Sequence, residues 1–240
     1  MRESVLVVGA SGKIGRVIAK RLANMGRDLI LQCNRNCGVL KEVGESSLES
    51  KTYIVKHDFL SEGIDAFVSK VKAITKRPPS IAIISIGVYD DTEFTESTEH
   101  NVLSVLTINL AVHVRIVEAL ATWMSTGGGT IMVLTDVTPL RGPDVYCGLK
   151  PSLPYLAASA GVHALIRSAP SRLPSNVHVV GIALGWVEGR HIPRKLRACI
   201  EESVPAGKAI PVQDVVNVVL SVAEMAELLN GEIIEVTGGL

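Results

Sequence analysis

The chain begins with a continuous apolar run that ends in a loop containing three glycines. The run is Ser4–Ala10 (SVLVVGA), and the loop, Gly9–Gly15, has the sequence GASGKIG. An apolar run without polar alternation is typical of a strand buried on both faces, as in a parallel sheet. Apolar residues then recur at helical spacing up to Gly26, a residue type that commonly ends a helix. These features restrict the first part of the chain to a strand, a glycine loop and a helix.

The glycine loop predicts a dinucleotide-binding site. Glycines let the backbone approach a pyrophosphate closely, and the free N–H groups at the start of a helix attract its negative charge. Spaced glycines alone could form an ordinary tight turn, but here they lie between a strand and a helix. We therefore expect cofactor contacts within the loop, at Gly9, Ser11, Gly12, Lys13, Ile14 and Gly15.

The alternation of strands and helices continues along the chain. Further strand-like runs lie at residues 29–33, 52–58, 80–87, 129–135, 176–184 and 232–236. Helical segments are expected between most of them, at about 61–74, 97–124, 152–168 and 212–228. Such alternation requires right-handed crossovers and gives a parallel sheet that helices cover on both faces. We predict one α/β domain over residues 1–240, a Rossmann-type doubly wound parallel sheet of about seven strands.

Two long stretches, residues 136–151 and 185–211, show no regular pattern, and both follow strands. Ligands of open α/β sheets bind outside the carboxyl ends of the strands. We therefore expect these irregular stretches to shape the substrate pocket.

The charge balance and the cysteine content limit the kinds of binding partner and metal site that the sequence supports. The chain carries 24 Lys+Arg and 24 Asp+Glu, so it offers no electrostatic case for binding nucleic acid or an anionic membrane. No apolar run appears long enough for a membrane span. The four cysteines are scattered, and no second pair or histidine cluster completes a metal site. We expect a cytoplasmic protein without a metal, its cysteines being free thiols in a reducing compartment.

The end of the second strand predicts the type of dinucleotide. A carboxylate at this point would hold the ribose hydroxyls of NAD. The chain instead has Asn34 and Arg35, and an arginine can bind a 2′-phosphate. Lys13 in the glycine loop adds positive charge nearby. We expect NADP(H) to be favoured over NAD(H), the alternative being that Arg35 is a solvated loop residue.

The order and spacing of several motifs resemble the short-chain dehydrogenase/reductase family over nearly the whole chain. GASGKIG resembles its cofactor loop, and Asp58 after the third strand resembles its adenine-contacting acid. Asn109 falls where the family has an active-site asparagine in the long central helix. The chain end, VPAGKAIPVQDVVNVVLSVAEM followed by NGEIIEVTGGL, is similar to that of 3-oxoacyl-acyl-carrier-protein reductases. The resemblance implies further cofactor contacts after the fourth and sixth strands, at Gly87, Gly185 and Val187.

The departures from the family pattern concentrate in the active site. Tyr155 matches the family tyrosine, but Ser159 stands four residues later, where the family has lysine. The position of the family serine, at the end of the strand IMVLTD, holds Asp136, with Thr135 beside it. The resemblance thus implies Asn109, Thr135, Asp136, Tyr155 and Ser159 as the catalytic candidates. Lys150 is the nearest cation in sequence, and it could replace the missing lysine if the 136–151 stretch folds back.

A second tyrosine competes with Tyr155. Tyr146–Lys150 (YCGLK) is a literal Tyr-x-x-x-Lys, but Pro151 follows directly and disfavours helix in the residue before it. Tyr155 fits the start of a continuous helix better, because Ser152 can cap that helix and Pro154 falls in its tolerated first turn. The sequence therefore favours Tyr155 over Tyr146.

These residues predict a reductase. In the family the tyrosine donates a proton to the carbonyl oxygen while the nicotinamide delivers hydride, and the lysine lowers the tyrosine pKa. An unassisted tyrosine has a pKa of ~10, so about 0.1% of it is ionised at pH 7. The missing lysine therefore favours carbonyl reduction, of a 3-oxoacyl compound or another small ketone, with Tyr155 as proton donor. The alternative is a degenerate relative that binds the dinucleotide without turnover, as a sensor or a partner subunit.

The two helices expected at 97–124 and 152–168 are apolar nearly all round. A helix covered only by its own sheet should have a polar outer face, so these helices suggest burial against a second subunit. In the family the matching helices form the dimer interface. We therefore expect a homodimer or a homotetramer.

Overall fold

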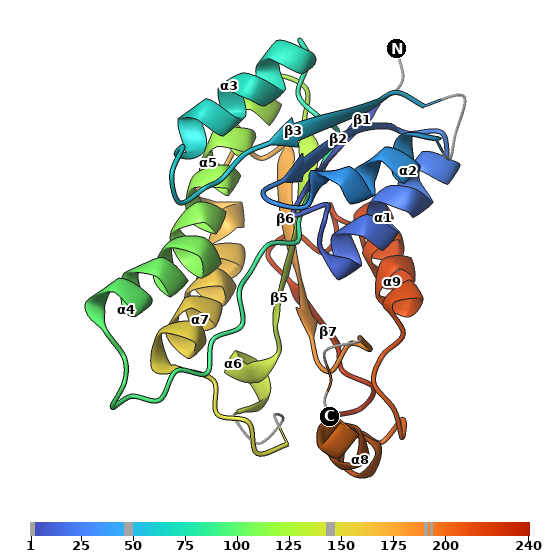
Figure 1. Ribbon diagram of the computed structural model, residues 1–240. Helices are drawn as coiled ribbons and strands as arrows, with labels where there is room; N and C mark the ends of the chain where they lie inside the picture. Colours follow the sequence, from blue (N-terminus) through green and yellow to red (C-terminus); the bar gives the residue numbers. More distant parts are fainter. Residues whose placement is uncertain (1–2, 46–49, 143–146, 190–191, 193) are drawn as a thin grey trace.

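Seven parallel strands form one sheet in the computed structural model (Figure 1). The structure describes residues 3–45, 50–142, 147–189, 192 and 194–240. The strand order is β3-β2-β1-β4-β5-β6-β7, and the predicted parallel sheet of about seven strands is confirmed. The strands are β1 (Ser4–Val8), β2 (Asp28–Cys33), β3 (Thr52–Lys56), β4 (Ile81–Ile84), β5 (Gly129–Asp136), β6 (Val177–Leu184) and β7 (Ile233–Val236).

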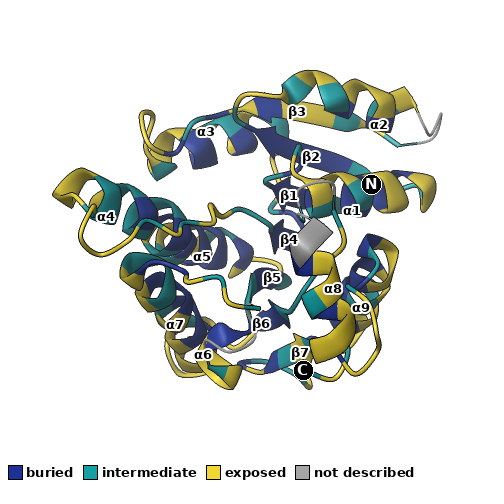
Figure 2. Ribbon diagram, turned by 60° about the horizontal axis from the view of Figure 1, so that its bottom comes forward, coloured by how far each residue is buried: buried dark blue, intermediate teal, exposed yellow. Residues whose placement is uncertain are grey.

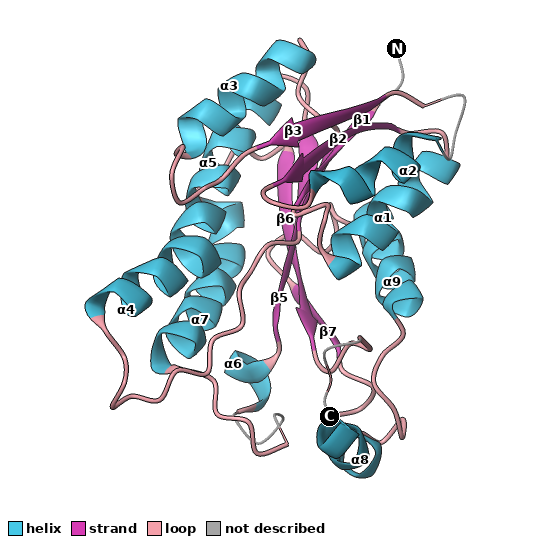
Figure 3. Cartoon of the chain, viewed as in Figure 1, coloured by secondary structure: helices cyan, strands magenta, loops and turns pink. Residues whose placement is uncertain are grey.

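Helices cover both faces of the sheet (Figure 3). One face carries α1 (Lys13–Asn24), α2 (Lys41–Glu45) and α9 (Val212–Glu224), and the other carries α3 (Ile64–Ile74), α4 (Glu99–Leu106), α5 (Val112–Met124) and α7 (Leu153–Ser168). The short helices are η1 (Cys37–Leu40), α6 (Thr138–Arg141), η4 (Ala169–Ser171) and α8 (Arg194–Ser203). The strand order reverses between β1 and β4, which places a ligand-binding crevice at their carboxyl ends.

Two apolar cores lie on the two faces of the sheet, and strand alternation supplies both. In β1, Leu6 and Val8 pack in the core under α3, α5 and α7, while Val5 and Val7 pack in the core under α1 and α9. All four side chains are fully buried. Figure 2 shows the central strands as the buried middle of the fold, whereas β3 at the edge of the sheet has exposed residues. The continuous apolar run at the start of the chain is therefore the signature of a strand covered on both sides.

The helix expected at 97–124 has a local change of geometry. A π-helical turn, η2 (Thr107–Ala111), separates α4 from α5. The whole run Glu99–Met124 is long and apolar enough to cross a membrane by length and composition, contrary to the expectation from sequence. Ile116 and Leu120 of this run are buried in the core against the sheet, however, and a core helix passes the same test.

Parts of the two stretches expected to be irregular form helices. In the 185–211 stretch, α8 buries Leu196 and Ile200, which are four residues apart and share a helix face, and Val204 directly after the helix is buried as well. In the 136–151 stretch, α6 forms one short turn directly after β5. Neither helix has a long run of apolar residues at helical spacing in its sequence.

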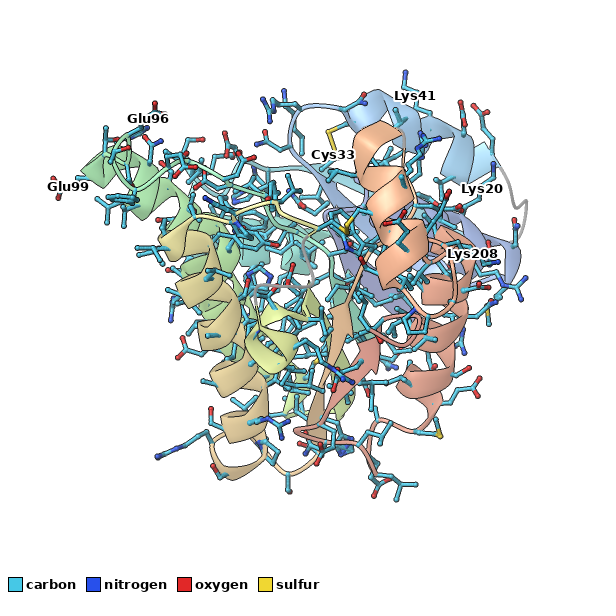
Figure 4. All side chains as sticks on the ribbon, turned by 90° about the horizontal axis from the view of Figure 1, so that it is seen from below. Lys20, Cys33, Lys41, Glu96, Glu99 and Lys208 are labelled. Atoms are coloured by element: carbon cyan, nitrogen blue, oxygen red, sulfur yellow. A yellow bond between two sulfur atoms is a disulfide. The ribbon has the colours of Figure 1, made fainter. Side chains whose placement is uncertain are left out.

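The cysteines are paired, so the expectation of free thiols is wrong. One disulfide joins Cys33 at the end of β2 to Cys37 in η1, and its Cys33 side chain is labelled in Figure 4. The other joins Cys147 in the segment before α7 to Cys199 in α8, with Cα atoms 5.8 Å apart. Folding brings the second pair together across 52 residues of sequence, which spacing alone could not indicate.

Candidate active site

A cavity of about 320 Å³ opens at the carboxyl edge of the sheet. Its walls come from the ends of β4, β5 and β6, the first turn of α1, the central helix around η2, and α7. Ile14 and Val187 line it on one side, and Tyr155 and Ser159 of α7 line it as well. The predicted cofactor loop and the predicted catalytic tyrosine therefore meet at one cavity.

Two glycines of the loop lie where the surrounding backbone leaves no room for a side chain. Gly9 has a φ of +78°, and a Cβ there would collide with the Ser85 carbonyl oxygen. A Cβ at Gly15 would collide with the Gly9 carbonyl oxygen. Gly12 caps α1 without a side-chain hydrogen bond, and the first turn of α1 has no acidic residue. These features suit a phosphate group at the helix start.

Gln32 holds the glycine loop in place, a role that sequence reasoning missed. The Gly9 N–H donates to Gln32 Oε1 at 2.8 Å, and Gln32 Nε2 donates to the His57 carbonyl at 2.8 Å. The Ala10 N–H also donates to the Gln32 carbonyl at 2.8 Å. One buried side chain thus ties together the carboxyl ends of β1, β2 and β3. A glutamine inside the apolar run DLILQC was the available signal, because a buried amide needs partners.

The predicted specificity residues follow β2 and β3, which are neighbours in the sheet. Asn34 and Arg35 lie inside the ring closed by the Cys33–Cys37 disulfide, and Arg35 is exposed. Asp58 follows β3, and its Oδ1 accepts a hydrogen bond from the Leu60 N–H at 3.1 Å.

Lys13 bridges to the loop after β6. Its Nζ donates to the Val187 carbonyl at 3.1 Å. Burial lowers the Lys13 pKa from its ordinary value, and the Glu188 carboxylate opposes this effect. Gly185 and Gly87, the other predicted cofactor contacts, line the cavity with Val187.

Asn109 lies within the π-helical turn and is buried. Its Oδ1 accepts from the Val88 N–H and its Nδ2 donates to the Val88 carbonyl, both at 2.8 Å. The side chain therefore holds the segment after β4, including Gly87, against the central helix.

Tyr155 and Asp136 form a hydrogen-bonded pair at the cavity wall. The Tyr155 hydroxyl donates to Asp136 Oδ2 at 2.9 Å. Asp136 Oδ1 accepts from the Thr138 N–H at 2.7 Å and from the Thr138 hydroxyl. Helix α7 starts as expected, because the Ser152 hydroxyl accepts from the Tyr155 N–H at 3.3 Å. This cap fixes the first turn of α7, which carries Tyr155.

The remaining catalytic candidates divide into two groups. Thr135 lines the cavity, and so does Ser159, which is buried one helical turn beyond Tyr155. Lys150 is exposed and does not line the cavity. Tyr146, the competing tyrosine, lies outside the described residues. The structure thus brings together five of the six candidates, all except Lys150.

The electrostatics of the cavity are set by carboxylates. Among the described residues that line it, Asp136 is the one acid, and none is a lysine or an arginine. Burial lowers the pKa of His113, another lining residue, to about 4. Burial, and after it Asp91, Asp136 and Asp90, raise the pKa of Tyr89 to about 12. Asp136 is therefore the acidic side chain of the described lining, and the Lys13 ammonium is held at the carbonyl of Val187, another lining residue.

His113 is a further polar residue of the cavity lining. It lies on α5, is fully enclosed, and faces the cavity together with Asn109. Its Nδ1 has no hydrogen-bond partner among the described residues. Within the same residues, no group of three His, Cys, Asp or Glu side chains could hold a metal ion.

Comparisons with known proteins agree with this geometry. A family model described as enoyl-(acyl carrier protein) reductase matches residues 9–240. The chain is 25% identical to human (3R)-3-hydroxyacyl-CoA dehydrogenase, over 98% of this chain and 94% of the relative. It is 26% identical to a 3-oxoacyl-acyl-carrier-protein reductase of Aquifex aeolicus, over 98% and 96%. A solved short-chain dehydrogenase/reductase from Serratia marcescens has the same fold, with a TM-score of 0.88, 17% identity, and coverage of 99% and 97%.

Proposed function

Because this chain belongs to the short-chain dehydrogenase/reductase family, we propose that it is an NAD(P)H-dependent oxidoreductase that reduces a small carbonyl compound. The observation that carries the proposal is one shared cavity. Ile14 at the glycine loop and Tyr155 on α7 both line it. A dinucleotide held by the loop and a substrate held near the tyrosine would therefore meet there.

The cofactor is held by the loop and the strand ends. The first turn of α1 and the glycines Gly9 and Gly15 receive the pyrophosphate. Arg35 binds the 2′-phosphate, so NADP(H) is favoured over NAD(H). Asp58 contacts the adenine, and Val187 lies over the nicotinamide. When bound, the nicotinamide supplies the hydride.

Tyr155 is the proton donor in this proposal. A phenol with an ordinary pKa of ~10 keeps its proton near neutral pH, as a donor must. In the structure that proton is donated to Asp136. Carbonyl reduction therefore requires the hydroxyl to turn from Asp136 to the substrate oxygen. Ser159, on the same helix face, holds the cofactor ribose or a water, but a neutral hydroxyl cannot lower the tyrosine pKa by charge.

A second candidate function is nucleotide binding without turnover. Two observations favour it: Ser159 replaces the family lysine, and Lys150 is exposed away from the cavity. In this case the protein is a sensor or a partner subunit. Titration with NADPH and NADH, followed by a panel of small ketones and 3-oxoacyl thioesters, separates the two candidates. A reductase consumes NADPH, and Tyr155→Phe loses that activity but keeps the NADPH affinity; the binding protein consumes none.

The proposal includes a substrate class, an assembly and a location. A 3-oxoacyl substrate is suggested by the name of the Aquifex relative. A homodimer or homotetramer through α4, α5 and α7 is supported by the exposed leucines Leu103 and Leu153 on these helices. A monomeric mass in light scattering at micromolar concentration would contradict that assembly. A cytoplasmic location remains a prediction, and the paired cysteines count against it because reducing compartments keep thiols free.

A further inference from the structure

The hydrogen bond between Tyr155 and Asp136 determines what a substrate can find in the cavity. An ionised carboxylate only accepts hydrogen bonds. Because the Tyr155 proton points at Asp136 Oδ2, the Tyr155 oxygen presents its lone pairs to other groups. In this arrangement both side chains are acceptors toward the cavity. They therefore suit a substrate that donates a hydrogen bond. A carbonyl oxygen, which only accepts hydrogen bonds, suits them less well.

The charge at the cavity wall also favours a hydrogen-bond donor over a ketone as the substrate. Reduction of a ketone builds negative charge on oxygen, and a carboxylate next to that oxygen raises the energy of the transition state. Asp136 is the formal charge in the lining, and Asp90 and Asp91 lie close enough to act on Tyr89. No lysine or arginine is among the described lining residues, and the Lys13 ammonium is held by the carbonyl of the lining residue Val187. A cationic substrate, in contrast, is attracted by the Asp136 carboxylate.

The geometry of Asp136 allows both a structural and a chemical role. Its Oδ1 accepts from Thr138 and fixes the turn after β5, while its Oδ2 faces Tyr155. The carboxylate is therefore held in one orientation by its own loop. The charge at the cavity wall is fixed in place before a substrate arrives.

We propose that the preferred substrates of this chain are compounds with a protonated carbon–nitrogen double bond, which the site reduces to amines, and that Asp136 is the residue that selects them. This inference rests on the proposed function, because it assumes the same cofactor and the same cavity. It names the substrate class: cyclic or linear imines formed from an amine and a carbonyl compound. Ketones are the poorer substrates in this account.

The reaction balances without another reactant. The iminium carbon receives a hydride, two electrons and one proton, from the reduced nicotinamide dinucleotide. The π electrons of the C=N bond become the lone pair of the nitrogen, and the products are a neutral amine and the oxidised dinucleotide. Asp136 keeps the nitrogen protonated before the step, because a nearby carboxylate favours the cationic form. No alkoxide forms, so the missing serine and lysine are not needed.

A matched pair of ring compounds tests the preference. Methylpyrroline is a cyclic imine, and methylcyclopentanone is a ketone of similar size with a five-membered carbon ring and a methyl group. With NADPH in excess, the wild-type protein should reduce the imine at least tenfold faster, measured as loss of NADPH absorbance. Asp136→Ser restores a hydroxyl donor and should reverse the order, while Asp136→Asn should lose the imine preference. Glu224→Gln on the exposed end of α9 removes a negative charge outside the cavity and serves as the control.

Binding to the protein without cofactor gives a readout that does not depend on turnover. Methylpyrrolidine, the amine product, is a cation near neutral pH, and methylcyclopentanol is its neutral counterpart. In calorimetry the amine should bind the wild-type protein roughly tenfold to a hundredfold more tightly, the range expected of a charge-assisted hydrogen bond. Asp136→Asn should remove this difference, and Glu224→Gln should keep it. The wild-type comparison stands even if the Asp136 variants fold poorly.

The outcomes separate this inference from the proposed function. Faster reduction of the imine and tighter binding of the amine support both. Faster reduction of the ketone overturns the inference and leaves the proposed reductase standing. If neither compound is reduced, the proposed function fails for these substrates and the calorimetry decides the inference. Equal binding of amine and alcohol, or a preference that survives Asp136→Asn, overturns it.

Discussion

Removing the disulfide between Cys147 and Cys199 is expected to destabilise the protein by several kcal/mol. The bond joins the segment before α7 to α8 across a sequence separation of 52 residues. In the chain-entropy description, closing a loop of this length restricts the unfolded chain by about 4 kcal/mol at 25 °C. The Cys33–Cys37 bond has a separation of 4 residues, and the same relation gives about 2 kcal/mol.

Two double variants test the difference between the bonds. Cys147→Ser/Cys199→Ser should lower the melting temperature by roughly 8–16 °C, because a protein of this size loses about 2–4 °C per kcal/mol. Cys33→Ser/Cys37→Ser, the matched control, should lower it by about half as much. Thermal unfolding followed by circular dichroism without reductant gives both values, and alkylation of free thiols gives the oxidation state of each sample.

One result would refute the loop-closure reasoning. Suppose that alkylation finds all four wild-type cysteines oxidised, and yet Cys147→Ser/Cys199→Ser melts at the wild-type temperature. The restriction of the unfolded chain would then contribute nothing measurable. An equal loss in the two double variants would contradict the dependence on loop length and would assign the effect to local contacts.

Three further predictions concern single side chains. Arg35→Ala should weaken NADPH binding by roughly 1.5–3 kcal/mol and leave NADH binding nearly unchanged; in a titration, equal losses would mean that Arg35 is structural. His113→Phe should reduce the pH dependence of stability between about pH 6.5 and 4, measured by urea unfolding. Burial holds the pKa of His113 near 4 in the folded protein, so as the pH falls His113 takes up a proton in the unfolded chain first. Wild-type stability therefore falls as the pH falls, and this group contributes at most about 3 kcal/mol to the loss. Ser159→Lys should raise reductase activity or extend it to alcohol oxidation near neutral pH, since the ammonium lowers the Tyr155 pKa; an unchanged pH profile would argue against Tyr155 as the acid.

Local patterns were sufficient for the sheet and for the long helices that cover it. The continuous run of β1 predicted burial on both faces, and Val5 and Leu6 do pack in opposite cores. Ser152 and Pro154 predicted the start of α7, and the Ser152 cap is present. Such signals extend over a few residues, so they can be read along the chain.

The site depends on contacts that no short window contains. Tyr155 and Asp136 are 19 residues apart, and their hydrogen bond depends on how the segment between them folds. Cys147 and Cys199 are even further apart in sequence, by 52 residues. The sequence predicted which residues would gather at the sheet edge, but not that Asp136 would accept the tyrosine proton. That detail follows from the orientation of the turn after β5.

The bond from Lys13 to Val187 has a consequence for the speed of cofactor exchange. It joins residues 174 positions apart in sequence, one at the start of α1 and the other in the loop after β6. A single hydrogen bond to an ammonium contributes only about 1.5–3 kcal/mol, and loops of this kind move within nanoseconds to microseconds. This bond alone is therefore too weak to hold the loop after β6 in one position. Exchange of oxidised for reduced dinucleotide should follow affinity and concentration, without a slow protein motion that limits its rate.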